Sequence, residues 1–256
     1  MSKRNTQQRR HAIVSMLAEQ GEVSVDTLAN LFETSEVTIR KDLAALEKNG
    51  LLLRRYGGAV PIPQEMVSES SKEVSERKLA IAKAASGRIR DHNRIVIDSG
   101  STTGALISEL RDKRGLVVMT NSLVVANAIN DLENEPTLLM TGGTWDSHSD
   151  SFQGQVAEQV LRAYDFDQLF IGADGIDLGR GTTTFNEIVG LSRVMAEVSR
   201  EVVVMIESDK IGRKMPNLEL PWNAIHTLVT DSGISATDRE KIEALGVEVV
   251  CAEITE

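Results

Sequence analysis

The chain has 256 residues, of which 41% are hydrophobic, and it carries a net charge of −10. This hydrophobic content excludes an intrinsically disordered chain, and the length fits a small domain joined to a larger one. The only cysteine, Cys251, excludes a disulfide framework and a cysteine-based zinc site. No apolar run reaches the length of a membrane span, and no apolar stretch follows the basic N-terminus. We therefore expect a cytoplasmic protein without a membrane partner.

The charge is unevenly distributed along the chain. Residues 1–60 contain nine Lys and Arg against seven Asp and Glu, a balance of +2, whereas the remaining residues carry −12. A slightly basic head on an acidic body is typical of a DNA-reading module joined to a domain that does not bind DNA. We expect a head at 1–60, a linker rich in Pro, Ser, Glu and Gln at 61–76, and a body at 77–256.

Apolar spacing, capping residues and glycines in the head predict three short helices followed by a hairpin. The expected elements are helices over 7–19, from Ser24 to 32, and from the N-cap Ser35 to about Asn49 before Gly50, then strands over 51–56 and 59–60 around Gly57-Gly58. This order of elements predicts a winged helix-turn-helix, the fold that places its third helix in the major groove of DNA.

The third helix has one apolar face, formed by Ile39, Leu43 and Leu46. Its opposite side is small, polar and basic, which suits a helix in a major groove. The residues we expect to contact DNA from this helix and from the wing are Ser35, Thr38, Arg40, Lys41, Ala45, Lys48, Arg54, Arg55 and Tyr56.

Other basic residues of the head leave alternatives open. Arg40 points to a different side of the helix and has an acid two residues later, Asp42, so an internal ion pair is an alternative to a DNA contact. The charged helix face is by itself also compatible with simple solvation. We expect the basic pairs Lys3-Arg4 and Arg9-Arg10 to follow the DNA backbone.

The body alternates short apolar strands with helices. This alternation predicts a parallel α/β sheet covered by helices on both faces. The expected strands are 94–98, 116–119, 137–140, 168–171, 202–206, 227–230 and 247–250, and most are followed by turns rich in Gly, Ser, Thr or Asp.

Those turns predict a ligand site, because open α/β sheets bind ligands at the carboxyl ends of their strands. The loop 99–103 offers amides and hydroxyls to a phosphate. Lys210 offers a cation, and Asp174 and Glu187 offer acceptors to sugar hydroxyls. The expected effector-binding residues are Asp98, Ser99, Gly100, Ser101, Thr102, Thr103, Thr120, Asn121, Gly142, Gly143, Asp174, Glu187 and Lys210. The four histidines are scattered and no nucleotide-binding motif follows a strand, so we expect neither a metal nor a cofactor.

Several motifs carry a family resemblance. In the head, Thr38-Ile39-Arg40-Lys41-Asp42-Leu43 and Arg55-Tyr56-Gly57-Gly58-Ala59 resemble the signature of the DeoR-type bacterial repressors of sugar catabolism. In the body, Asp98-Ser99-Gly100-Ser101-Thr102-Thr103, Gly172-Ala173-Asp174-Gly175-Ile176 and Thr183-Thr184-Phe185-Asn186-Glu187 resemble the effector domain of that family. Within the family the chain looks most similar to glucitol-type repressors.

The resemblance implies a body similar in fold to the sugar-phosphate isomerases. It also implies a repressor of a sugar, polyol or amino-sugar operon, which binds double-stranded operator DNA and a small sugar or polyol phosphate as effector. Single heads bind DNA weakly, so we expect a dimer or tetramer on repeated half-sites. The residues do not show whether the effector releases or promotes DNA binding.

Two other functions remain open. One is an active sugar-phosphate isomerase or deaminase that carries a DNA-binding head. It would require a general base over a substrate carbon, for which Asp98, Asp174 and Glu187 are possible. The other is a winged helix used for protein contact. Because nothing in the sequence pairs these acids or raises their pKa, we favour a regulator that is not an enzyme.

Overall fold

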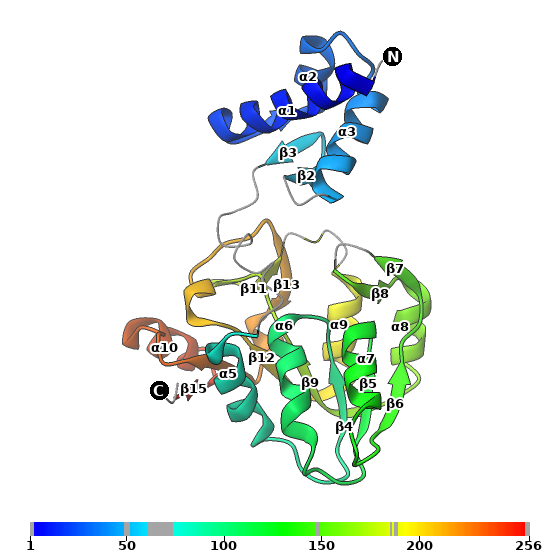
Figure 1. Cartoon of the computed structure of the whole chain (residues 1–256). Helices are drawn as coiled ribbons and strands as arrows, with labels where there is room; N and C mark the ends of the chain where they lie inside the picture. Colours follow the sequence, from blue (N-terminus) through cyan, green and yellow to red (C-terminus); the bar gives the residue numbers. More distant parts are fainter. Residues whose placement is uncertain are drawn as a thin grey trace. The chain divides into compact units, whose positions relative to one another are not determined.

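The computed structural model describes residues 3–48, 52–60, 74–146, 149–184, 186 and 189–253. The chain divides into two compact units, Met1–Lys72 and Glu73–Glu256, which are described separately here as the N-terminal and the C-terminal unit (Figure 1). The expected linker lies outside the described residues as far as position 73, as do the expected helix end at Asn49 and Gly50.

The N-terminal unit contains three helices and a small antiparallel sheet. Its elements are α1 (Lys3–Gln20), β1 (Val23–Ser24), α2 (Val25–Leu31), α3 (Glu36–Lys48), β2 (Leu53–Arg55) and β3 (Gly58–Val60), with strand order β1-β3-β2. This confirms the predicted winged helix-turn-helix. The sequence did not predict β1, because two residues give no periodic signal. It also placed the start of α1 too late, because residues 3–6 are polar and carry no apolar spacing.

The core of this unit forms where the sequence predicted it. Ile39, Leu43 and Leu46 of α3 are buried against Ile13 and Leu17 of α1. Apolar burial of this kind, rather than helix propensity, supplies most of the stability of short helices.

Caps and one glycine fix the helix starts and the wing. The hydroxyls of Ser24 and Ser35 accept hydrogen bonds from the backbone N–H of Thr27 and Thr38, at 3.0 and 3.3 Å. A Cβ atom on Gly58 would lie 2.2 Å from the carbonyl oxygen of Val23, so β3 pairs with β1 only if this residue is glycine.

The C-terminal unit is built on one seven-stranded sheet in which all paired strands are parallel. The strand order is β15-β14-β12-β9-β4-β5-β6. The strands are β4 (Arg94–Ile97), β5 (Val117–Thr120), β6 (Thr137–Met140), β9 (Phe166–Ile171), β12 (Ser199–Met205), β14 (Thr227–Asp231) and β15 (Glu248–Ala252). All seven match strands that the sequence predicted, because buried parallel strands are continuous apolar runs.

Helices cover both faces of this sheet, as predicted (Figure 1). One face packs against α5 (Glu76–Ser86), α6 (Ser101–Gly104) with the 3₁₀ helix η2 (Ala105–Leu110), and α7 (Leu123–Asn130). The other packs against α8 (Gln155–Leu161), α9 (Gly190–Glu197) and α10 (Ala236–Glu243). None of the described helices is long and apolar enough to cross a membrane.

The remaining elements were not predicted. They are a hairpin, β7 (Thr144–Asp146) with β8 (Ser151–Gln153), an antiparallel sheet of β10 (Gly175–Asp177), β11 (Gly181–Thr184) and β13 (Asn217–Pro221), and the 3₁₀ helices η3 (Ser208–Lys210) and η4 (Trp222–Ala224). These strands have three to five residues, which is too short for an apolar alternation to identify them reliably in a sequence.

Candidate DNA-binding and effector sites

The outer side of α3 presents small and basic groups. Lys41 is exposed, and Thr38 and Ala45 are half-buried beside it. The hydroxyls of Ser35 and Thr38 are 2.9 Å apart, so the start of the helix is already internally hydrogen-bonded. Lys41 has no ion pair within the described residues. The side chain of Lys48 lies outside them.

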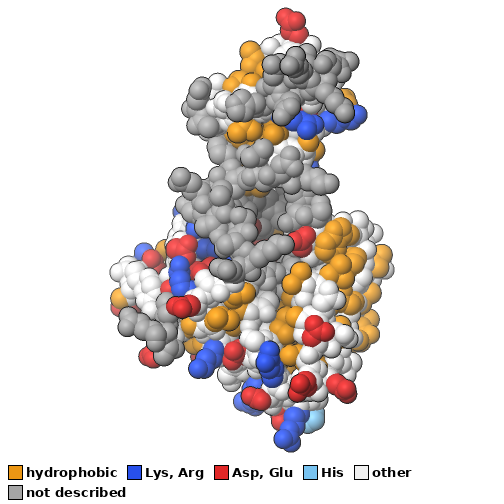
Figure 2. Space-filling model, in the orientation of Figure 1, with side chains coloured by type: hydrophobic (Ala, Val, Ile, Leu, Met, Phe, Trp, Pro, Cys, Tyr) orange, Lys and Arg blue, Asp and Glu red, His pale blue; other side chains and the backbone are white. Residues whose placement is uncertain are grey.

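The wing adds a second set of exposed groups at the turn between β2 and β3. Tyr56 is fully exposed, and Arg55 is exposed without an acidic partner in the described part of the chain. On the face drawn in Figure 2, the blue Lys and Arg side chains of this unit gather at one edge. These groups are available to an external anion such as a DNA phosphate.

The expectation that Arg9 follows the DNA backbone was wrong, and for Arg10 it stays a prediction. Arg9 is 6% exposed, and its guanidinium donates to Asp42 of α3 at 2.6 Å. Arg10 donates to the other oxygen of the same carboxylate at 2.8 Å. The two arginines therefore join α1 to α3 inside the unit, and Arg9 is not available to a DNA backbone. The side chains of Lys3 and Arg4 lie outside the described set.

Two other expected DNA contacts have partners within the unit. Arg40 pairs with Glu36 one turn earlier at 2.7 Å, not with Asp42, and both side chains are exposed. Arg54 is held by Glu47 of α3 at 2.5 Å, and the same carboxylate also accepts from the backbone N–H of Arg54. The pair with Glu47 connects the wing to α3.

In the C-terminal unit, the ends of β4 and β5 bring predicted effector residues together. The side-chain amide of Asn121 donates to Asp98 at 2.8 Å, and its oxygen accepts from the backbone N–H of Ser99 at 3.0 Å. The backbone N–H of Asp98 in turn donates to the carbonyl of Phe170 at the end of β9. Three neighbouring strands thus fix one carboxylate at the centre of the carboxyl edge.

Two hydroxyls and one glycine of the predicted effector residues make contacts that hold the loops in place. Thr103 is fully buried and donates to the carbonyls of Asp98 and Gly100 at 2.8 and 3.1 Å. The buried hydroxyl of Thr120 accepts from the N–H of Ser122. Gly143, at a φ of +111°, allows a close approach, because a Cβ atom there would lie 2.5 Å from the carbonyl oxygen of Gln153. These three residues shape the edge and position its other groups.

Acidic groups interact across this edge. Burial raises the pKa of Asp98 to about 6, against the opposing hydrogen bonds from Asn121 and Ser99, and the charge of Asp174 raises it further. Burial likewise raises the pKa of Glu219 to about 8, with contributions from the charges of Asp98 and Asp174. At neutral pH the Glu219 carboxyl is therefore mostly protonated, and it accepts a hydrogen bond from Ser192 at 2.7 Å.

The other predicted groups of the edge have defined positions. Asp174 accepts from the hydroxyl of Thr184 at 2.6 Å. Lys210 is 9% exposed, and its ammonium lies 3.5 Å from the carbonyl oxygen of Ala173. Glu187 lies outside the described residues. Among the residues that are described, no group of three or more His, Cys, Asp or Glu could hold a metal ion.

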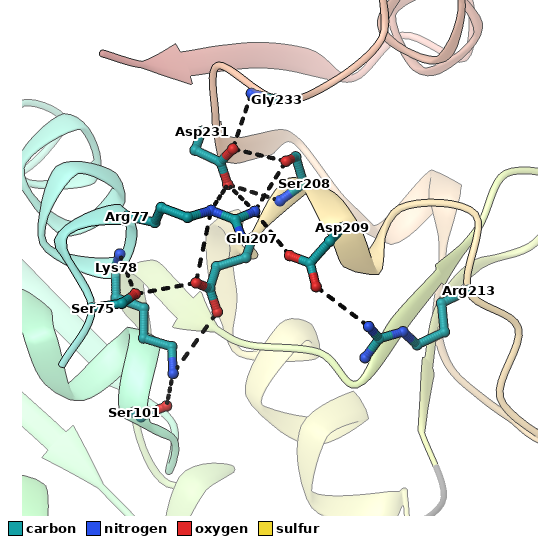
Figure 3. A network of polar contacts seen from close by, with 10 residues as sticks. All are labelled: Ser75, Arg77, Lys78, Ser101, Glu207, Ser208, Asp209, Arg213, Asp231 and Gly233. Carbon is teal, nitrogen blue, oxygen red and sulfur yellow. Dashed lines mark hydrogen bonds and ion pairs between the residues drawn. The ribbon is translucent and has the colours of Figure 1, made fainter. Parts of the chain in front are cut away.

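Sequence reasoning missed two residues of this region. Glu219 lies on β13, a strand that was not predicted, and an acid between Leu218 and Leu220 gives no sequence signal of burial. Lys78 is 5% exposed, and its ammonium donates to the hydroxyl of Ser101 at 3.0 Å (Figure 3). It lies three positions before the buried Ile81, and a lysine on the apolar face of a helix is a signal that could have identified it.

Comparisons with known proteins cover both units. A family model described as the DeoR-like helix-turn-helix domain matches residues 9–65, and one described as the DeoR C terminal sensor domain matches residues 73–232. A putative aga operon transcriptional repressor of Escherichia coli O157:H7 is 40% identical over 252 residues, which cover 96% of this chain and 93% of that protein. The HTH-type transcriptional regulator GlpR of Haloferax volcanii is 31% identical over 248 residues, which cover 95% and 96%.

Solved structures are less similar in sequence than these relatives. Ribose 5-phosphate isomerase A from Methanocaldococcus jannaschii is 20% identical with a TM-score of 0.38, covering 52% of this chain and 53% of that one.

Proposed function

Because the chain belongs to the DeoR family of DNA-binding transcriptional regulators, we propose that it represses a sugar, polyol or amino-sugar operon in response to a small phosphosugar. Residues 1–60 are the DNA-binding domain in this proposal, and residues 77–256 sense the effector. The protein acts in the cytoplasm, where its operator is accessible.

The observation that carries the DNA-binding role is the pair of exposed cations Lys41 and Arg55. They lie on α3 and on the wing, the two elements with which a winged helix contacts DNA, and they have no acidic partner in the described part of the chain. In this proposal Lys41 contacts base edges or phosphates in the major groove, and Arg55 contacts a backbone phosphate. The apolar face of α3 packs against α1, so only the side that carries Lys41 is available to a duplex.

The effector side of the proposal rests on the carboxyl edge of the seven-stranded sheet. The loop from Ser99 to Thr103 offers hydroxyl and amide groups to a phosphate, and Lys78 and Lys210 are buried cations nearby in the fold. Asp98 and Asp174 are acceptors for sugar hydroxyls. A single winged helix contacts few phosphates, so we propose a homodimer or homotetramer that binds two half-sites.

The test is a gel-shift titration of the purified chain against the DNA upstream of its own gene. A scrambled duplex of equal length and composition serves as the control. We expect at least about 1000-fold tighter binding to the specific site, with affinity falling as salt rises. Glucosamine 6-phosphate and glucitol 6-phosphate, each compared with its unphosphorylated form, then test the effector. Equal binding to both duplexes would refute the proposal.

A second candidate is a sugar-phosphate isomerase that carries a DNA-binding head. The observation in its favour is the raised pKa of Asp98, about 6, because a carboxyl that titrates near neutral pH suits a general base. Turnover of ribose 5-phosphate or glucosamine 6-phosphate by the purified chain, lost in Asp98→Ala, would establish it. If the chain does not turn over these compounds but its DNA binding responds to them, the isomerase is excluded and only the regulator remains.

A further inference from the structure

Val37 is an exposed apolar residue at the start of α3. It is the second residue of the helix and is 60% exposed, and it takes no part in the core of the N-terminal unit. Branched aliphatic residues are also less favourable in a helix than straight side chains, so helix formation does not favour a valine here. Single exposed apolar residues are common on protein surfaces, and the role of Val37 therefore depends on its direction and its neighbours.

Val37 points to the side of α3 that lies opposite the core. Ile39, two residues later, is fully buried, and two positions correspond to about 200° around a helix. Lys41 lies two residues after Ile39 and is exposed. Val37 and Lys41 are thus about one helical turn apart, and residues at this spacing have Cβ atoms about 5–6 Å from each other. The two side chains are neighbours on the side of α3 that we propose enters the major groove.

The polar side chains next to Val37 are engaged within the unit. The hydroxyls of Ser35 and Thr38 lie 2.9 Å apart, and the Ser35 hydroxyl also accepts from the backbone N–H of Thr38. Arg40 pairs with Glu36 at 2.7 Å. At its start, the outer side of α3 therefore presents one aliphatic group beside one ammonium that has no ion pair in the described part of the chain.

An aliphatic group and an ammonium recognise different bases in the major groove. Thymine presents its 5-methyl group there, whereas guanine presents the acceptors O6 and N7, to which a lysine ammonium donates. In a helix-turn-helix, the N-terminal residues of the recognition helix contact the base edges. Val37 is the second residue of α3 and lies in that part of the helix. Its side chain therefore fits a thymine methyl group and no other feature of the groove.

We propose that Val37 contacts the 5-methyl group of a thymine in each operator half-site, within two base pairs of the base that Lys41 contacts. The proposal rests on the DNA-binding function proposed above and names a residue that distinguishes bases. The distance of two base pairs follows from Cβ atoms about 5–6 Å apart and a rise of about 3.4 Å per base pair. Against cytosine or guanine the same side chain would cover a polar group without a hydrogen bond, which disfavours these bases.

A second exposed apolar residue of the unit provides a matched control. Leu31, the last residue of α2, is 55% exposed. In a helix-turn-helix the first of the two helices crosses the DNA backbone, and the second lies in the groove. Leu31 and Val37 are thus similar in chemistry and exposure but belong to different helices. Alanine at each position separates a contact with a base from a general loss of exposed apolar surface.

The first test removes the methyl group from the DNA. In the upstream duplex of the gel-shift titration, each thymine of the bound site is replaced in turn by deoxyuridine, which keeps the hydrogen-bonding groups of thymine and lacks only the methyl. We expect one such replacement in each half-site to weaken binding by the unmodified chain about fourfold, as for one buried carbon group. Unchanged affinity at every thymine would overturn the proposal.

The second test shortens the side chain of the protein. Val37→Ala should reduce the difference between the thymine and deoxyuridine duplexes to less than about twofold, because the two changes remove the same contact. Leu31→Ala should keep the full difference, and thermal unfolding checks that both variants fold. A fourfold difference that persists in Val37→Ala would assign the methyl contact to another residue and overturn the proposal. If the unmodified chain binds neither duplex specifically, the proposed function fails and this proposal with it.

Discussion

The two units use Lys and Arg side chains in opposite ways. In the N-terminal unit Lys41 and Arg55 are exposed without internal partners, whereas in the C-terminal unit Arg77 and Lys78 are turned inward onto carboxylates and a hydroxyl. The division is not complete, since Arg9 is also buried against an acid. Whether a cation is available to DNA therefore depends on its burial and on its acidic partners within the unit. The local excess of positive charge does not determine this availability.

The largest expected effect tests the internal cations of the N-terminal unit. Asp42→Ala leaves Arg9 buried without its counter-charge, and we expect the unit to lose about 3–5 kcal/mol of stability. Hydrogen exchange of the amides in α1 and α3 measures this loss. Glu36→Ala removes the exposed partner of Arg40 and should cost about 1 kcal/mol or less. Equal losses in the two variants would mean that burial does not distinguish these pairs.

The next effect concerns the acids of the sensor. The folded pKa of Glu219, about 8, lies above the ordinary value of 4.5, so the folded state binds this proton more tightly. Its contribution to stability is complete below pH 4.5 and is lost as the pH rises to about 8. We expect the free energy of unfolding to fall by on the order of 3 kcal/mol over this pH range. Urea unfolding monitored by the fluorescence of Trp222 measures this change. Glu219→Gln should flatten this dependence, and an unchanged slope would contradict the assignment.

The smallest expected effects, on operator binding, distinguish exposed cations without an acidic partner from those that have one. Lys41→Ala and Arg55→Ala should each weaken operator binding by about 1–3 kcal/mol, and loss of Arg55 should reduce the salt slope by about one. Arg40→Ala should weaken it less, because Glu36 already neutralises that guanidinium. Gel shifts at several salt concentrations measure all three. An effect of Arg40→Ala larger than that of Lys41→Ala would place a different side of α3 in the groove.

The periodic parts of the fold were predictable, and its polar contacts were not. Ile39, Leu43 and Leu46 repeat at helical spacing, and the strands of the large sheet are continuous apolar runs, so a single sequence shows both. The partner of Arg9 is 33 residues away, and no local pattern connects it to Asp42. Its proximity to other basic residues suggested a DNA contact, whereas packing of α1 on α3 determines its position.

At the carboxyl edge of the seven-stranded sheet, the sequence likewise predicted the arrangement of the strands but not the polar contacts. The turns after β4, β5 and β9 were predicted to meet because parallel strands end at one edge, and Asp98, Asn121 and Ser99 do meet there. Which hydroxyls face inward depends on loop conformation, so the sequence could not show that the hydroxyl of Thr103 is buried and donates to the carbonyls of Asp98 and Gly100. Glu219 was missed because β13 was not predicted and because an acid between two leucines gives no sign that it is buried.

The contact between Arg77 and Asp231 spans 154 residues of sequence. During translation the winged helix is complete long before this anchor of the C-terminal unit, since Asp231 must leave the ribosome before it can fix the first turn of α5. A message that terminates earlier would still encode the whole DNA-reading part without this anchor. The contact between Arg77 and Asp231 is thus a property of the nearly complete polypeptide, and a truncated chain would contain the winged helix without it.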